Sequence, residues 1–403
     1  MSVRSNNIAY KADAVFVGGG PVGLFTAAQI KAINPDAKVT VVERYSEYKR
    51  KHVLIIDSAS LSGMTDHPEL KKFAETIKKS NTIATSKIES DLKNIALELG
   101  VKIIHEKVED PSKLCKKFKN AKVIFGTDGA HSIIRKKIFG GEKSVRETIS
   151  HIAEVKYLTT GEGHRTKKIL KSSIKHYSHR WVTEHVGKKN AKGKTSITIR
   201  LALSKREFEI LKGSGRATFK DPLNLNSDED KKLIPKKLLS TINKWHSIKK
   251  KLYNETAEDV KITATSLDVY KSKEIVTKKN NITYALVGDS AFGVPFFRSL
   301  NNGLLCATKA AKEFAPKLTL KENDLTEASD KYKSYVTSLA KTQIMRAKIK
   351  GSVLSIYFSA IRIVSGITHL PLKEKIIDFF VKIIYQINFL VNSITSFYST
   401  RTE

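Results

Sequence analysis

The chain has 403 residues, of which 40% are hydrophobic, 8% aromatic and 28% charged, so it can bury a sizeable core and is not a disordered chain. Its length suits two or three packed lobes. The 72 Lys and Arg residues outnumber the 40 Asp and Glu residues and give a net charge of +32, which favours anionic surroundings. The basic residues are scattered in pairs such as Lys71-Lys72, and no nucleic-acid-binding motif is present, so we expect no nucleic-acid partner.

Cysteine usage and the N-terminal segment bear on the compartment. Cys115 and Cys306 are too few for a disulfide framework or a thiolate metal cluster, and the helical pattern around Cys306 favours a small buried hydrophobe. No apolar run precedes the first strand, so no secretory signal is visible. We therefore expect a reducing, cytoplasmic setting.

A glycine-rich turn gives the first chemical signal. Residues 14–17 predict a short buried strand, the next apolar face predicts a helix that stops at Asn34-Pro35, and residues 38–44 predict a second strand ending in Glu43. The turn between them, residues 18–23, has the pattern Gly-x-Gly-x-x-Gly. An ordinary tight loop is the alternative, but five agreeing context elements favour dinucleotide binding.

Each part of this motif has a physical reason. Gly18 permits the tight turn, Gly20 lets a pyrophosphate approach the backbone, and Gly23 lets the helix pack closely on the sheet. Free amides at the helix N-terminus receive the diphosphate charge. The carboxylate of Glu43 is placed to accept hydrogen bonds from an adenosine ribose. We expect residues 54–80, which follow, to be irregular and to contribute to the substrate side.

Two later segments also end strands in Asp-Gly or Gly-Asp. Residues 123–126 predict a strand that runs into Asp128-Gly129, and residues 283–287 predict one that runs into Gly288-Asp289, followed by Pro295 and the Asn301-Asn302-Gly303 turn. A carboxylate such as Asp289 suits a row of ribityl hydroxyls. The alternatives are a plain turn at Asp128-Gly129 and a helix N-cap at Asp289.

Between these segments the pattern changes. Alternation at 151–158, 172–186, 195–203 and 260–270 predicts an antiparallel sheet with one wet face, interrupted by a charged helix at 228–250. His176, His179 and His185 fall in this region. A separation of three places the first two on opposite strand faces, so we expect ordinary strand histidines and no metal site.

The C-terminal region is more apolar. Residues 353–358 and 376–398 are apolar over most of a helix circumference, with a break at residues 369–371. Asp378 and Lys382 argue against a bilayer-spanning helix. Two interpretations remain open: these helices pack on the protein body, or they lie in a membrane interface with lysines reaching phosphate headgroups.

Together the three motifs resemble the class A FAD-dependent monooxygenases of the p-hydroxybenzoate hydroxylase fold. The resemblance implies an α/β protein with a Rossmann-like FAD-binding domain, an antiparallel β-sheet substrate domain and a C-terminal helical region. It divides the chain into residues 1–150 and 282–340 (FAD-binding), 151–281 (substrate domain) and 341–403 (C-terminal helices). It also implies that Gly18, Gly20, Gly23 and Glu43 contact ADP, that Asp128 and Gly129 serve both FAD and NAD(P)H, and that Asp289 holds the ribityl chain. The other expected cofactor contacts are Pro21, Val22, Arg44, Gly288, Pro295 and Asn301.

Two weaker resemblances add detail. The stretch after Glu43 is similar to the MICAL flavin domains, which would make Arg50 a flavin contact. Residues 294–297 with their Asn-rich turn are similar to kynurenine 3-monooxygenase, which carries a membrane-associating C-terminal segment. Two features depart from the family pattern: the loop 296–303 has one glycine and several bulky residues, and Ser86 stands where an arginine is usual.

The resemblance implies an NAD(P)H-using FAD monooxygenase that transfers oxygen from a flavin C4a-hydroperoxide to a small-molecule or protein substrate. No catalytic side chain is required, because the cofactor carries the chemistry. One alternative is a flavin-dependent reductase of a membrane lipid, similar to the geranylgeranyl reductases. Another is a catalytically impaired flavoprotein that acts as an interaction module. A cytoplasmic protein with peripheral membrane contact through the C-terminal helices fits all three hypotheses.

Overall fold

The computed structural model describes residues 10–47, 53–79, 82–166, 180, 182–295, 298–320 and 324–366. The chain separates into two compact units. Unit 1 runs to Glu147 and resumes at Val269–Met345, and unit 2 comprises Thr148–Asp268 and the chain from Arg346 on. The chain therefore returns to unit 1 at Val269, earlier than the boundary at 281 that the sequence suggests. Residues 276–279, for example, pair within the sheet of unit 1.

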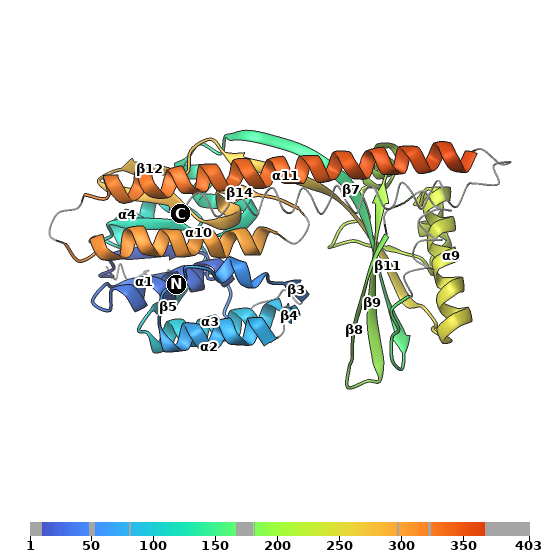
Figure 1. Cartoon of the computed structure of the whole chain (residues 1–403), viewed down its shortest axis with the longest axis horizontal. Coiled ribbons are helices and arrows are strands. Elements are labelled where there is room, and N and C mark those ends of the chain that lie inside the picture. Colours follow the sequence, from blue (N-terminus) through green and yellow to red (C-terminus); the bar gives the residue numbers. More distant parts are fainter. Residues whose placement is uncertain are drawn as a thin grey trace, which may run out of the picture. The chain divides into compact units, whose positions relative to one another are not determined.

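Unit 1 is built on a six-stranded sheet in the order β12-β13-β6-β1-β2-β5. Figure 1 labels its two edge strands, β12 and β5. Its neighbouring strands are parallel except for β12, which pairs antiparallel with β13. The central strands are apolar and buried on both faces, as a parallel sheet between helical layers requires. The strands are β1 (Ala14–Val17), β2 (Val39–Glu43), β5 (Lys102–His105), β6 (Val123–Gly126), β12 (Val276–Lys279) and β13 (Ile282–Leu286).

Helix α1 (Pro21–Ile33) follows β1 directly and packs between α3 (Thr85–Glu98) and α10 (Ser299–Phe314). Pro21 opens α1, where its missing N–H costs nothing. Tyr332, from α11 (Thr326–Gly366), is fully buried and donates its hydroxyl to the backbone oxygen of Leu286 at 2.8 Å. The smaller elements of unit 1 are β3 (Val53–Ile55), η1 (Ser58–Leu61), β4 (Thr82–Ala84), η2 (Pro111–Lys113), α4 (Leu114–Lys117), η3 (Gly129–His131), α5 (Ile133–Ile138), η4 (Gly288–Ser290), β14 (Phe292–Gly293) and η5 (Ala315–Lys317).

The expectation that residues 54–80 are irregular is wrong for their second half. Pro68–Lys79 forms helix α2, which buries Leu70, Phe73, Ala74 and Ile77. These positions follow the i, i+3, i+4, i+7 spacing of one helix face. The many lysines on the opposite face conceal that spacing in the sequence.

Unit 2 contains an antiparallel sheet in the order β10-β11-β7-β9-β8. Its elements are β7 (Lys143–Thr160), β8 (Val182–Lys189), β9 (Lys194–Leu203), α7 (Lys205–Gly213), β10 (Leu223–Asn224), α8 (Asp228–Leu233), α9 (Lys236–Tyr253) and β11 (Glu258–Ser272), the first and last of which extend into unit 1. The predicted single helix at 228–250 is two helices, because Pro235 lacks an N–H and restricts the residue before it.

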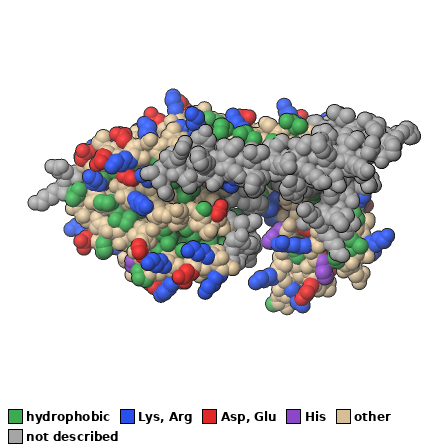
Figure 2. Space-filling view, viewed as in Figure 1, with side chains coloured by type: hydrophobic (Ala, Val, Ile, Leu, Met, Phe, Trp, Pro, Cys, Tyr) green, Lys and Arg blue, Asp and Glu red, His purple; other side chains and the backbone are tan. Residues whose placement is uncertain are grey.

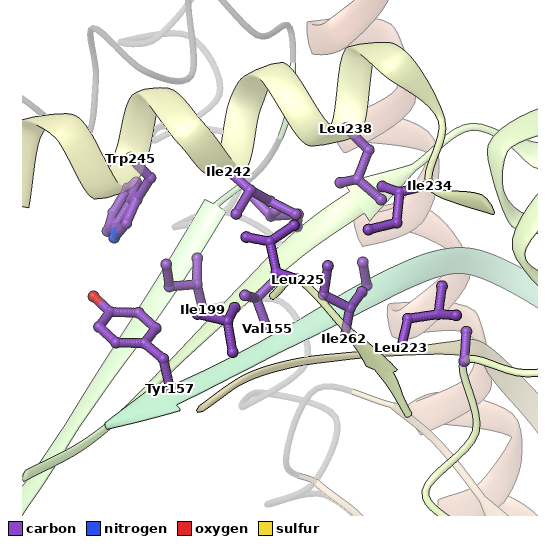
Figure 3. Close-up of a cluster of buried hydrophobic side chains, with 14 of the residues drawn as sticks. Val155, Tyr157, Ile199, Leu223, Leu225, Ile234, Leu238, Ile242, Trp245 and Ile262 are labelled. Atoms are coloured by element: carbon purple, nitrogen blue, oxygen red, sulfur yellow. The ribbon is translucent and has the colours of Figure 1, made fainter. Parts of the chain in front are cut away.

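Helix α9 covers one face of this sheet. Figure 3 shows Leu238, Ile242 and Trp245 pointing from α9 toward Val155 and Ile199 on the strands. Beyond Trp245 this interface becomes charged, because Lys249 is 1% exposed and lies 3.0 Å from Glu184 and 3.1 Å from Glu255. An apolar core thus ends in a buried ion-pair cluster.

On the face of unit 1 that Figure 2 shows, acidic and basic side chains are intermingled. Among the described residues, no helix is both long enough and apolar enough to cross a membrane. The apolar segment predicted at 376–398 lies outside the described residues.

Candidate functional site

The three sequence motifs meet at one edge of the unit 1 sheet. Strands β13, β6, β1 and β2 are consecutive neighbours and run parallel, so their carboxyl ends share an edge. Those ends are Leu286, Gly126, Val17 and Glu43. Each motif begins one or two residues after one of these ends. The carboxyl edge of such a sheet is where ligands bind in open α/β folds.

The glycines of the first motif have separate roles. Gly18 has a φ of +108°, and a Cβ built on it would lie 2.6 Å from the backbone oxygen of Thr127. A Cβ on Gly23 would lie 2.2 Å from the backbone oxygen of Gly18. A Cβ on Gly20 would meet nothing within 4 Å. Gly18 and Gly23 therefore serve backbone packing, whereas Gly20 borders open space.

Glu43 at the end of β2 is bound to the glycine turn. Its Oε2 accepts from the backbone N–H of Gly19 at 2.7 Å, and its Oε1 accepts from that of Tyr45 at 3.0 Å. Both oxygens keep further lone pairs for a ligand. Arg44 is exposed, with its guanidinium 4.5 Å from the centre of the Tyr45 ring, so it does not join the glycine turn.

The first and third motifs are in close contact through Val22. A Cβ built on Gly288 would lie 3.2 Å from Val22 Cγ1, and one on Gly303 would lie 2.5 Å from Val22 Cγ2. Gly288 also has a φ of +66°, in the left-handed region that favours glycine. The absence of side chains at both glycines therefore lets α10 approach the start of α1.

Only one of the two carboxylate oxygens of Asp128 is hydrogen-bonded within the described residues. Its Oδ2 accepts from the backbone N–H of Ile133 at 2.5 Å and of Ile134 at 3.4 Å, the first two residues of helix α5, whose N-cap is Ser132. Its Oδ1 is covered and has no hydrogen-bond partner among the described residues. Burial raises the pKa of this carboxyl, and hydrogen bonds from Ser132 and Ile133 oppose the rise. Gly129 beside it has a φ of +78° and borders open space. The interpretation of Asp128-Gly129 as a plain turn therefore explains the hydrogen bonds of one carboxylate oxygen and leaves the other oxygen for a ligand.

Arg135 holds the second and third motifs together, and the sequence did not single it out. Its Nη1 donates to the backbone oxygens of Ser290 at 2.7 Å and Asp289 at 3.3 Å, and its Nη2 donates to that of Ala130 at 2.5 Å. The hydroxyl of Tyr270 also donates to the Asp289 oxygen at 2.7 Å. Arg135 is 5% exposed although it opens a run of three basic residues, Arg135-Lys136-Lys137, a composition more typical of a surface segment.

The loop after the third motif is more tightly bound than expected for an open turn. The side-chain oxygen of Asn301 accepts from the backbone N–H of Asp57 at 2.9 Å, and Arg298 donates to Gln343 at 3.1 Å. Asn302 is 4% exposed, and within the described ranges its Nδ2 has no hydrogen-bond partner. Pro295 is half-buried at the start of this loop. Asn302 is thus a further candidate contact that the sequence analysis did not include.

Several expected residues lie elsewhere. Arg50, His176 and His179 are outside the described residues, and His185 is half-buried on β8 in unit 2. In the part of the chain that the structure describes, no group of three or more His, Cys, Asp or Glu side chains could hold a metal ion. Cys306 is fully buried, and burial raises the pKa of its thiol to about 12, which makes it unreactive.

The edge fits a flavin dinucleotide. Gly20 caps α1, no side chain of the described residues caps that helix end, and the open space beside Gly20 admits a diphosphate near the free amides. Glu43 offers acceptors for a ribose, and the unpartnered Oδ1 of Asp128 and Nδ2 of Asn302 offer an acceptor and a donor. These groups come from all three motifs.

Comparison with known proteins places the fold. No protein-family model and no curated sequence matches the chain. Among solved structures, the tetracycline destructase Tet(51) matches with a TM-score of 0.53 at 14% identity, over 95% of this chain and 98% of that chain. PqsL, a probable FAD-dependent monooxygenase from Pseudomonas aeruginosa, matches with a TM-score of 0.51 at 10% identity, over 86% of this chain and 97% of that chain.

A third match is the halogenase PltM, solved in complex with FAD, with a TM-score of 0.53 at 12% identity, over 87% of this chain and 77% of that chain. These similarities establish the fold of the chain. The chain is an α/β protein with a Rossmann-like parallel sheet and a separate antiparallel sheet, as the sequence predicts, and its fold is similar to the folds of these solved structures.

Proposed function

We propose that this protein is an FAD-dependent monooxygenase that uses NAD(P)H. The observation that supports the proposal most is the convergence of three distant motifs at one sheet edge, where Arg135 joins the second and third. A turn that served packing alone would not need an open space at Gly20 together with an unpartnered carboxylate oxygen on Asp128. Two proteins of similar fold agree with it, since PqsL is described as a probable FAD-dependent monooxygenase and the halogenase PltM binds FAD.

Each residue has a role under this proposal. Gly20 and the amides of α1 bind the diphosphate, Glu43 accepts from the ribose, and Asp128 and Asp289 accept from hydroxyls farther along the cofactor. Bound FAD would supply the redox chemistry and the activation of oxygen. The chain's own part is to bind, to orient and to exclude water, which Arg135 supports by fixing the backbone of the third motif.

The first experiment is a visible absorption spectrum of the purified protein, alone and after incubation with FAD. We expect flavin bands that remain after gel filtration, and substrate-dependent consumption of NADPH or NADH together with oxygen. A protein that neither carries nor takes up flavin contradicts the proposal. Because Gly18 and Gly23 are needed for packing, Gly20→Ala is the variant of choice for showing that uptake occurs at this edge.

Two alternatives make different predictions. A flavin-dependent reductase of a membrane lipid consumes NAD(P)H without oxygen, so an oxygen electrode separates it from a monooxygenase. A flavoprotein without turnover is favoured by Arg298, which occupies the loop after Pro295 and is held there by Gln343. That alternative predicts bound FAD that NAD(P)H does not reduce, and rapid bleaching on mixing excludes it.

Membrane contact through the C-terminal region is a separate proposal. Described residues of α11 include the exposed side chains of Met345, Ile349 and Ile356 near Lys341 and Lys348. An apolar stripe flanked by lysines suits an interface with anionic lipid. Sedimentation with vesicles that contain or lack phosphatidylserine tests it, and equal recovery with both vesicle types contradicts it.

A further inference from the structure

A polar cavity of about 180 Å³ lies in unit 1 between the β12-β13 hairpin and the first turns of α11. Lys278 on β12 and Thr283 on β13 both line it, and they are paired in register. Thr283 is the second residue of β13, whereas Leu286 at the other end of that strand belongs to the candidate cofactor site. None of the described residues proposed to contact the cofactor lines this cavity, so it is a separate site.

The register of the sheet directs Thr283 toward the helices that cover it. Thr283 and Ala285 lie on the same face of β13, and Ala285 is paired with Phe125 of β6. The ring of Phe125 lies 5.3 Å from that of Phe314, which lies 5.8 Å from the ring of Tyr332 on α11. The face of the sheet that carries Thr283 is therefore the face that α10 and α11 cover.

The cavity contains hydroxyl groups that are not used by the fold. Thr283 is 5% exposed, and its hydroxyl makes no hydrogen bond to any described residue. The hydroxyls of Thr277 and Ser329, which also line the cavity, likewise make none within the described ranges. A polar group removed from bulk water without a partner lowers stability, so the Thr283 hydroxyl requires water or a ligand in the cavity.

Three charged side chains share the cavity without pairing. Lys278, Asp330 and Lys333 all line it and are exposed, and none of them forms an ion pair with a described residue. Asp324, just before α11, already accepts from the backbone N–H of Thr326 at 2.9 Å. The cavity therefore offers two ammonium groups and several hydroxyls as donors, and the Asp330 carboxylate as an acceptor.

We propose that this cavity binds a small phosphate-type anion that also carries an O–H group. The ammonium groups of Lys278 and Lys333 and the hydroxyl of Thr283 donate to the phosphate oxygens. The Asp330 carboxylate accepts from the O–H group and repels an anion that has none. Free hydrogen phosphate and the phosphate ester of a small polyol both have this chemistry. The proposal does not depend on the proposed flavin function, since the two sites share no residue.

The test is isothermal titration calorimetry of the full chain with inorganic phosphate, glycerol phosphate and sulfate at constant ionic strength. At about pH 8 all three are dianions, but sulfate has no O–H for Asp330, so it should bind at least about tenfold more weakly. The net charge of +32 attracts all three alike, so the comparison removes diffuse attraction. Tighter binding of glycerol phosphate identifies an ester as the ligand, and tighter or equal binding of inorganic phosphate identifies the free anion.

Variants at exposed positions test the assigned contacts without disturbing the core. Lys278→Gln and Lys333→Gln should each weaken phosphate binding by about tenfold, because each removes a charged donor. Lys341→Gln, exposed on the same helix but outside the cavity, is the matched control and should stay within about twofold of the wild type. Asp330→Asn should bind sulfate nearly as well as phosphate, because the repulsive carboxylate is gone.

Four results overturn the proposal: no binding of either phosphate, equal binding of sulfate by the wild type, equal weakening by Lys341→Gln, or unchanged anion preference in Asp330→Asn. Each variant is compared at an unfolding temperature measured without anion, so that a loss of binding is not confused with a loss of fold. None of these results bears on flavin binding, which the FAD titration tests separately.

Discussion

The guanidinium of Arg135 donates to the backbone oxygen of Asp289, which lies 154 positions later in the chain. The same side chain reaches Ser290 and Ala130, so one cation fixes the turns that follow β6 and β13. It does so by binding carbonyl groups whose hydrogen-bonding capacity would otherwise be lost on burial.

Replacement of Arg135 should therefore loosen both turns. We expect Arg135→Ala to lower the free energy of unfolding by about 2–4 kcal/mol, because the buried carbonyl of Ser290 and the partly buried carbonyls of Asp289 and Ala130 lose a charged donor. The affinity for FAD should fall by a larger factor than the stability of the fold. Urea unfolding and flavin titration measure the two effects. Lys136→Ala, at the exposed neighbouring position, is the control, and equal effects of the two substitutions contradict this role.

The glycine turn offers a sharper pair of variants. Gly23→Ala places a methyl group 2.2 Å from the Gly18 oxygen, so we expect a loss of stability of about 3 kcal/mol or more. Gly20→Ala meets no atom within 4 Å and has an ordinary φ of −72°, so the fold should keep its stability within about 1 kcal/mol. FAD affinity should nevertheless fall, because the methyl group enters the space left for the diphosphate. Full FAD affinity in a folded Gly20→Ala protein would contradict this placement.

Substitution of Lys249, the buried cation of unit 2, should lower the free energy of unfolding without changing FAD affinity. Lys249→Met leaves Glu184 and Glu255, 0% and 2% exposed, without their shared partner. We expect a loss of about 3–5 kcal/mol, because breaking a buried ion pair strands its charges. Lys250→Met, at an exposed position, should be close to neutral. Differential scanning fluorimetry of both variants with and without FAD distinguishes this effect from one on the nucleotide site.

His246 predicts acid sensitivity of the same unit. Its ring lies 5.0 Å from that of Tyr157, and burial lowers its pKa from 6.5 to about 4. Between these pKa values the histidine is protonated in the unfolded chain and neutral in the folded protein. The contribution of His246 to the free energy of unfolding is therefore fully present above about pH 6.5 and is lost as the pH falls toward about 4. His246→Phe should reduce the difference in unfolding free energy between about pH 7.5 and about pH 5 by on the order of 1–2 kcal/mol. An unchanged difference, measured beside the exposed control His105→Gln, contradicts the assignment.

Much of the fold could be predicted because its signals are local. The strand, glycine turn, helix and acid at 14–43 predict β1, α1 and β2 from spacing and from the need of each glycine for room. The order of the three motifs predicts the parallel sheet, and alternation predicts the antiparallel sheet. Helix α2 was not predicted because its lysines conceal four buried positions, and the single helix predicted at 228–250 is two helices because Pro235 interrupts it.

The amino-acid order by itself determined which backbone segments turn, and where a carboxylate ends a strand. It did not determine that Arg135 points inward, or that one oxygen of Asp128 has no hydrogen-bond partner among the described residues. Those facts depend on which side chains are removed from water together. Burial of that kind is a property of packed helices and strands, since the pKa of a carboxyl and the bonding of a guanidinium change only when distant parts of the chain close around them.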